Sequence, residues 1–299
     1  MTPSDDRNGK DRFATLTFER DVAVAASALW AAWTAPAARA IWAAPSPAVT
    51  VEFLETATKV GEREVSLCKT QGHPDIRCEC GWLVLQPTQR SVNYELLSSD
   101  GVPQSAALVT ADISGKGSAS RLVVTVQLSA LAADMADGYR HGFGAGLANL
   151  AGVAERIMLL QRTIKAPRNR VWGAWMNERT LPQWWGPEGF SCRTTRIDLR
   201  AGGEWVFDMI GPDGTVYPNH HRYHTVQPEE WIGYTLHWGE NGPKHADAWA
   251  AFEEANGATT VTLGMVFSTA AEFQTAKGFG AVELGQETLG KLERFVAAS

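Results

Sequence analysis

Apolar residues recur at two different periods along this 299-residue chain, and the pattern is clearest in the second half. An apolar stretch over 159–164 predicts a strand. Two short helices follow it, one marked by Trp172 and Trp175 at helical spacing and the next by Trp184, before a Gly-Pro pair stops the helical pattern. The second half therefore begins with one strand, and two short helices separate this strand from the segments that follow.

Alternating apolar and polar residues between turn signals then predict six more strands. They cover residues 192–199, 204–210, 217–226, 231–238, 246–254 and 259–267. The final segment, 270–298, carries Leu289 and Leu292 at helical spacing and is long enough to cross a sheet. Strands joined by tight turns pair antiparallel and need a helix over their apolar face, so the pattern predicts an α+β fold in which a curved sheet wraps one long helix.

The first half repeats this order. Three tryptophans recur 142 positions later (172−30, 175−33 and 184−42): Trp30, Trp33 and Trp42 correspond to Trp172, Trp175 and Trp184. A repeat of this length is a whole domain with its own core. We therefore expect two tandem domains, 13–157 and 158–299, with the long helix of the first over 135–156. Because almost no linker separates them, we expect the two copies to form an internal pseudo-dimer.

Composition and charge exclude several classes of partner. The chain has 44% hydrophobic and 20% charged residues, as globular proteins do. Its net charge of −6 argues against nucleic acid and anionic membranes, because both require concentrated positive charge. The most apolar stretch, 22–33, is too short to span a bilayer, so a cytoplasmic protein with no membrane partner is expected.

Cysteine and histidine give little support to a metal site. The four cysteines, Cys68, Cys78, Cys80 and Cys192, occupy positions that are not equivalent in the two copies, so reduced thiols are expected. Cys78 and Cys80 share a strand face without further ligands, which favours a packing role. Five of the seven histidines fall within 220–245, but their spacing does not suit zinc. We predict no metal and no cofactor.

Four segments of the second half, taken in order, carry a family resemblance. They are 166–172, 181–187, 201–204 and 227–235. Together they resemble the domain of the activator of heat-shock protein 90 ATPase homologue family, a branch of the SRPBCC (START, birch-pollen-allergen-like) superfamily. The first copy is a diverged relative, with Ala43 and Ala44 where the second has Trp185 and Gly186. The resemblance implies the helix-grip fold, in which a cavity lies between a curved antiparallel sheet and the C-terminal helix.

Strand alternation in the second copy selects most of the candidate residues for such a cavity, and the helical Trp184 and the neighbouring His237 are added to them. The candidate ligand-binding residues are Trp184, Trp205, Phe207, Met209, His221, Tyr223, Tyr234, Leu236, His237 and Trp238. The aromatic members could equally be ordinary core. A histidine or a tyrosine among them would supply a polar contact that orients an otherwise apolar ligand.

These observations favour a binding protein for a small apolar or aromatic molecule, and they assign the ligand to the second domain. The alternative is a protein-interaction module that docks on a chaperone or a client, without ligand or catalysis. No nucleophile elbow or phosphate-binding loop is present, so we predict no catalytic residue, although cyclase-like or hydrolytic chemistry stays open. The first domain has fewer histidines and lacks the second tryptophan of the pair, which favours a structural role.

Overall fold

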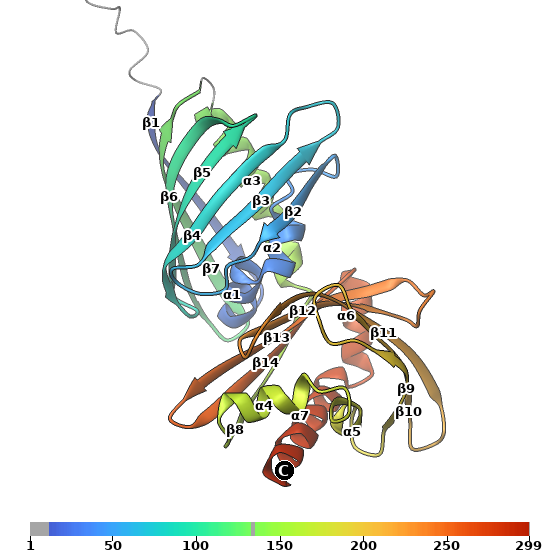
Figure 1. Cartoon of the computed structure of the whole chain (residues 1–299). Helices are drawn as coiled ribbons and strands as arrows, with labels where there is room; N and C mark the ends of the chain where they lie inside the picture. Colours follow the sequence, from blue (N-terminus) through green and yellow to red (C-terminus); the bar gives the residue numbers. More distant parts are fainter. Residues whose placement is uncertain (1–11, 133–134, 299) are drawn as a thin grey trace, which may run out of the picture. The chain divides into compact units, whose positions relative to one another are not determined.

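The computed structural model describes residues 12–132 and 135–298, and the chain divides into two compact units, Met1–Glu155 and Arg156–Ser299 (Figure 1). We call them the first and the second unit. Each contains a sheet of seven antiparallel strands and the helices that cover it. The predicted α+β class and the two tandem helix-grip domains are confirmed. Among the helices of the described residues, none is long and apolar enough to cross a membrane.

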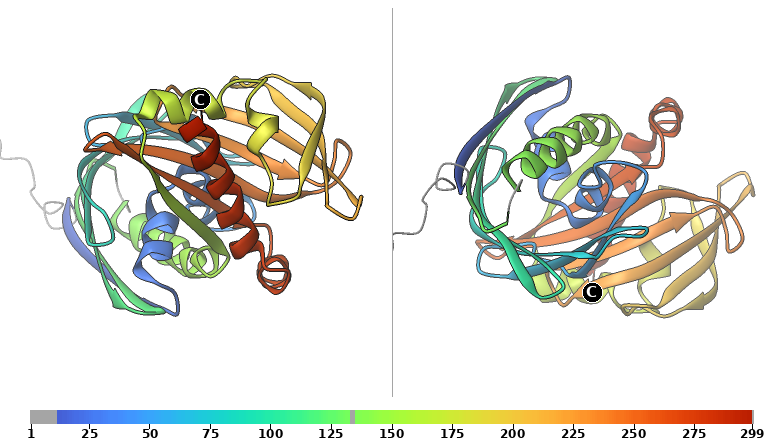
Figure 2. Two further views of the ribbon diagram at one scale, coloured as in Figure 1. Left: turned by 90° about the horizontal axis from the view of Figure 1, so that it is seen from below. Right: turned by 90° about the horizontal axis from the view of Figure 1, so that it is seen from above.

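The first unit follows the order strand, two helices, six strands, helix. Its elements are β1 (Phe13–Val22), α1 (Ala26–Thr34), α2 (Pro36–Trp42), β2 (Val49–Glu55), β3 (Arg63–Thr70), β4 (Ile76–Gln86), β5 (Arg90–Ser99), β6 (Val102–Lys116), β7 (Ala119–Ala130) and α3 (Met135–Ala154). The strand order is β1-β7-β6-β5-β4-β3-β2. Helix α3 lies along the concave side of this sheet (Figure 2). The face of the sheet toward α3 is called the inner face below.

The second unit repeats the order with one more helix. Its elements are β8 (Ile157–Ile164), α4 (Arg168–Trp175), α5 (Leu181–Trp184), β9 (Ser191–Ile197), β10 (Glu204–Ile210), β11 (Val216–Gln227), β12 (Trp231–His237), β13 (Lys244–Ala255), β14 (Ala258–Phe267), α6 (Ala270–Gly278) and α7 (Ala281–Ala298). The strand order is β8-β14-β13-β12-β11-β10-β9. Helix α7 crosses the inner face of this sheet (Figure 2).

Two helices, rather than one uninterrupted helix, occupy the predicted helical segment 270–298. Thr269 and Glu272 form a capping box that starts α6. Gly280 then adopts a φ of +77°, a conformation that suits glycine and ends the helix beside the exposed Phe279. Only α7 carries a buried stripe, which includes Leu289, Leu292 and Val296. The grip on the sheet is therefore made mainly by α7, while α6 adds a contact between Phe273 and Phe267 of β14.

The repeated tryptophans have a local structural cause. The indole Nε1 of Trp42 donates a hydrogen bond to the carbonyl oxygen of Ala32 (2.7 Å), and Trp184 does the same to Ala174 (2.9 Å). Each bond ties the second short helix of a unit to the first. In the first unit Trp42 also stacks on Trp33 at 5.2 Å between ring centroids. A buried indole needs a partner for its N–H, and the repeated bond supplies it.

The outer face of the second sheet gives a first stability prediction. Trp249 stacks on Trp231 (5.9 Å between ring centroids) and its indole covers Gly264 on the neighbouring strand. A methyl group at position 264 would overlap that ring, so we expect Gly264→Ala to destabilise the second unit by about 1–3 kcal/mol. The free energy of unfolding, measured in urea, tests this. Gly173→Ala is the control, because a Cβ at this position in α4 meets nothing within 4 Å, and it should be neutral or stabilising.

Candidate functional site

Three adjacent strands bring most of the predicted cavity residues of the second unit together. Trp205 and Phe207 on β10, His221 and Tyr223 on β11, and Tyr234 and Leu236 on β12 all lie on the inner face, where the register pairs Trp205 with His221 and Tyr223 with Tyr234. Trp184 of α5 joins the same buried cluster, and Met209 packs against it half-buried. The interior beneath α7 is therefore walled mainly by aromatic rings.

His221 lies at the centre of this aromatic wall. Its ring centroid is 5.4 Å from those of Trp185 and Trp205, and 5.1 Å from those of Phe207 and Tyr234. Only 3% of its surface is exposed. Burial lowers the pKa of His221 to about 3, and the nearby histidines add to the effect. The imidazole is therefore neutral at physiological pH.

Three polar side chains of this interior lack protein partners. His221, Tyr223 and Tyr234 are 3%, 3% and 2% exposed, and no hydrogen bond joins their side chains to any residue that the structure describes. Burial raises the pKa of both tyrosines, so both hydroxyls stay protonated. The three groups thus have unused hydrogen-bonding capacity on one apolar wall.

Two predicted cavity residues, His237 and Trp238, lie elsewhere. His237 faces the other side of the sheet, where it pairs with His220 and donates from Nδ1 to the carbonyl oxygen of Gly242 (3.4 Å). Trp238 follows the end of β12, is 54% exposed and stacks on His245 at 4.2 Å. His237 directly follows the inner-face residue Leu236, so strand alternation itself places it on the opposite face. Trp238 lies beyond the end of β12, where a register shift at Leu236/His237 interrupts the alternation that had assigned it to the cavity.

The histidines and cysteines form no metal-binding group of three or more among residues 12–132 and 135–298. On the outer face His220 contacts the carboxylate of Glu204 through Nε2 at 2.7 Å. All four cysteines are free.

The first unit contains a buried charged cluster that the sequence analysis did not predict. Arg39 of α2 forms an ion pair with Glu64 of β3, and the two are 8% and 2% exposed. The guanidinium also lies over the rings of Phe53 and Trp82, at 5.1 Å and 5.3 Å from their centroids. An arginine is rarely so buried unless it is paired. Charge is therefore concentrated inside the unit that was expected to be structural.

Cys80 lies between two carboxylates in this cluster. It is directly opposite Glu64 on β3 and directly opposite Glu95 on β5, and its Sγ lies 3.3 Å from Oε1 of Glu64. Glu95 accepts a hydrogen bond from the hydroxyl of Tyr139 in α3 (2.6 Å). The same hydroxyl lies 3.3 Å from the hydroxyl of Ser105. The row Glu64, Cys80, Glu95 thus runs across three strands of the inner face.

The same cluster shifts several pKa values. Burial raises the pKa of Glu95 against the opposing effect of its hydrogen bond from Tyr139. The neighbouring thiol of Cys78 is the main influence that lowers the pKa of Cys80, and Arg39 adds to it, while burial and the carboxylates of Glu95 and Glu79 act in the opposite direction. The pKa of Cys78 itself is raised, by the neighbouring thiol and by burial. Cys78, Cys80 and Glu95 are only half-buried, although all three lie on the inner face. Their surroundings therefore leave part of each side chain accessible.

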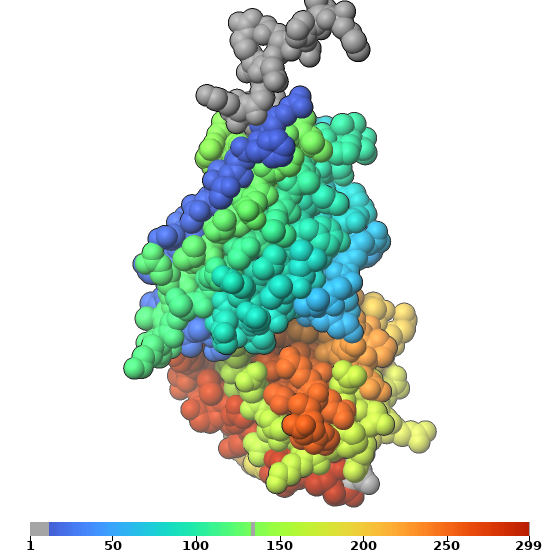
Figure 3. Space-filling view, turned by 90° about the vertical axis from the view of Figure 1, so that its left-hand side faces the viewer, coloured from blue at the N-terminus to red at the C-terminus, as the bar shows by residue number. Residues whose placement is uncertain are grey.

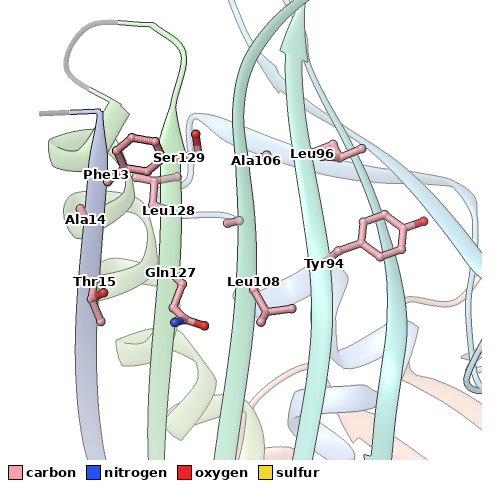
Figure 4. A pocket seen from close by; sticks show the side chains of 11 residues that line it. Phe13, Ala14, Thr15, Tyr94, Leu96, Ala106, Leu108, Gln127, Leu128 and Ser129 are labelled. Carbon is pink, nitrogen blue, oxygen red and sulfur yellow. The ribbon is translucent and has the colours of Figure 1, made fainter. Parts of the chain in front are cut away.

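An open groove lies on the outer face of the first sheet, away from this cluster. Phe13, Tyr94, Leu96 and Leu108 point into it, and its volume is about 560 Å³ (Figure 4). The strands that carry it, β1 and β5 to β7, face the viewer in Figure 3. A second groove, of about 530 Å³, runs beside α7 and is lined mainly by charged residues. Neither groove contains the residues described above.

Comparison with known proteins identifies the second unit. Residues 165–297 match the family described as "Activator of Hsp90 ATPase homolog 1-like protein". The resemblance predicted from the sequence of the second half is therefore confirmed. No curated protein matches the chain.

Solved structures also match, each with a TM-score below 0.5. Protein NE0264 from Nitrosomonas europaea is 25% identical, with a TM-score of 0.45, over 48% of this chain and 96% of its own. Protein Mll3558 from Rhizobium loti is 27% identical, with a TM-score of 0.42, over 46% and 95%. The di-domain ARO/CYC BexL from the BE-7585A biosynthetic pathway is 16% identical, with a TM-score of 0.39, over 95% and 98%.

Proposed function

We propose that the second unit binds one small, mostly apolar molecule between the inner face of its sheet and α7. The supporting observation is the set of three buried, unpartnered polar groups on an aromatic wall, His221, Tyr223 and Tyr234. Binding pockets combine apolar walls with a few polar groups that fix orientation, as this interior does. The ligand would carry at least one hydroxyl or carbonyl group.

The chemistry of the wall narrows the ligand further. At neutral pH both tyrosines are protonated and His221 is uncharged, so the interior carries no charge in these three groups. A charged ligand group would be desolvated there without a counter-ion, at a large free-energy cost. A neutral aromatic or alicyclic molecule with one polar group fits this environment. The groups supply orientation, and we assign no catalytic role to them.

A pair of probes tests this proposal. The full chain is dialysed to equilibrium against 2-naphthol and, separately, against naphthalene. Because a neutral hydrogen bond contributes about 0.5–1.5 kcal/mol, we expect 2-naphthol to bind up to about tenfold more tightly. The double variant Tyr223→Phe/Tyr234→Phe should lose that preference while still binding naphthalene.

Tyr217→Phe is the matched control, because Tyr217 is 41% exposed at the start of β11. It should leave both affinities unchanged. If neither probe binds, or if the preference survives in the double variant, the proposal is contradicted. The protein-interaction alternative would then be favoured. Pull-downs with Hsp90, the chaperone in the description of the matched family, would test it.

A further inference from the structure

The sheets of the two units match in detail, so their inner faces can be compared position by position. The N–H of Gly61 donates to the carbonyl oxygen of Trp82 (3.1 Å), and the same bond joins Gly202 to Tyr223 (2.8 Å), 141 positions later (202−61 and 223−82). The register shift that follows Trp82 in β4 likewise recurs after Tyr223 in β11. Inner-face residues of β3, β4 and β5 therefore correspond to those of β10, β11 and β12 at this interval.

Equivalent inner-face positions differ in size and polarity between the units. The second unit has large, mostly aromatic side chains, and the first unit has shorter polar ones. In chain order the pairs are Trp205 and Glu64, Phe207 and Ser66, His221 and Cys80, Tyr234 and Asn93, and Leu236 and Glu95. The first unit therefore leaves space beneath α3 where aromatic rings fill the interior beneath α7.

Helix α3 does not close this space. It packs mainly against β1 and β7 of the sheet, and it reaches β5 through the long side chain of Tyr139, whose hydroxyl donates to Glu95. Cys78, Cys80 and Glu95 stay half-exposed although they face inward, so solvent reaches this part of the inner face. We call the space bordered by these three residues, Tyr139 and the half-buried Phe143 the inner cleft.

Glu95 carries the unbalanced charge of the inner cleft. Its Oε1 accepts the hydrogen bond from Tyr139 (2.6 Å), and no hydrogen bond joins its Oε2 to any residue that the structure describes. Burial raises the pKa of Glu95, and the charge of Arg39 opposes this effect, but Arg39 is already paired with Glu64. Two carboxyl groups thus share one guanidinium, and a further cation would complete the pairing.

We propose that the inner cleft binds a small primary amine, whose ammonium group donates hydrogen bonds to Oε2 of Glu95. Hydrogen bonds between charged groups are about twice as strong as neutral ones, and the ammonium supplies the missing counter-ion. The rings of Tyr139 and Phe143, stacked at 5.8 Å between centroids, would pack on the body of the ligand and attract its charge. An arylalkylamine has both features. This site is independent of ligand binding by the second unit.

Two probes of nearly equal size test the inner cleft. The full chain is dialysed to equilibrium at pH 7 against 2-phenylethylamine, which is then a cation, and separately against its neutral analogue 2-phenylethanol. Glu95→Gln keeps the size of the side chain and its acceptor for Tyr139 but removes the charge. We expect this variant to bind 2-phenylethylamine at least about tenfold more weakly, with its affinity for 2-phenylethanol unchanged.

Glu79→Gln is the matched control, because Glu79 lies between Cys78 and Cys80 on β4 but faces the outer side of the sheet. It removes the same charge from a neighbouring position and should leave the binding of both probes unchanged. Cys78→Phe places a ring inside the cleft and should abolish binding of the amine. Unchanged circular dichroism shows that each variant is folded.

The variant Tyr223→Phe/Tyr234→Phe separates this site from the one proposed in the second unit, and it should bind 2-phenylethylamine as the unsubstituted chain does. Absence of amine binding, or equal binding to the unsubstituted chain and to Glu95→Gln, would overturn the proposal and leave the one for the second unit untouched. Loss of amine binding in Tyr223→Phe/Tyr234→Phe but not in Glu95→Gln would place the amine in the second unit, which also overturns it.

Discussion

Replacing Arg39 with methionine will destabilise the first unit by about 3–5 kcal/mol, because the carboxylate of Glu64 is then left buried without its counter-ion. The side chain of methionine preserves much of the volume and still packs on Phe53 and Trp82. Loss of the charge is therefore the main change. Hydrogen exchange of peptides from β3 and β4, followed at increasing urea concentration, reports on this unit separately from the second.

Two controls show whether the effect comes from the buried charge. In the double variant Arg39→Met/Glu64→Gln no charge is left unpaired, so most of the lost stability should return. Arg121→Met breaks the exposed ion pair with Glu19 and should cost less than about 1 kcal/mol. If the double variant is as unstable as Arg39→Met, the packing of the arginine rather than its charge supports the core.

Acid will destabilise the second unit strongly through His221. Its pKa in the folded protein is about 3, below the ordinary value of 6.5 that applies to the unfolded chain. Between these values the unfolded state binds the proton and the folded state does not, so stability falls as the pH falls, by ~1.4 kcal/mol per pH unit. Above pH 6.5 the imidazole is neutral in both states, and His221 makes no contribution to the pH dependence.

The variant His221→Phe isolates this contribution. Between pH 6.5 and pH 5 this variant should lose about 2 kcal/mol less stability than the unsubstituted protein. The free energy of unfolding is measured by hydrogen exchange of peptides from β11 and β12 at increasing urea concentration. Part of the acid sensitivity should remain, because burial also lowers the pKa of His245 to about 4. His73→Gln, in an exposed turn of the first unit, is the control and should change nothing. An unaltered pH dependence in His221→Phe would show that this histidine is solvated.

The order of elements in both units followed from periodicity, because each strand and helix buries one face and thereby leaves a pattern in the sequence. The three tryptophan pairs showed the duplication, and Trp42 and Trp184 owe their recurrence to one repeated hydrogen bond. Alternation also placed His221 and Tyr234 on the inner face. It failed at Trp238, which lies beyond the end of the strand, whereas the choice of His237 went against it, because a residue next to Leu236 points to the other face. The pairing of the two copies into an internal dimer stays a prediction.

The hydrophobic periodicity of the sequence could not predict the charged cluster of the first unit. Arg39 lies in a helix of only seven residues, Pro36–Trp42, which is too short to show which face is buried. The neighbours of Cys80 lie on two other strands, β3 and β5. Only the register of these strands with β4 places Glu64 and Glu95 opposite Cys80. Charged residues at inward-facing strand positions, Glu64 and Glu95 among them, were the one available signal.

Native mass spectrometry of the freshly purified chain tests the central claim, that the interior of the second unit binds a small molecule. We expect an excess mass that disappears on denaturation and is reduced or lost in Tyr223→Phe/Tyr234→Phe, but not in Tyr217→Phe. A mass equal to that of the bare chain under native conditions, in preparations that also bind neither 2-naphthol nor naphthalene, would contradict it.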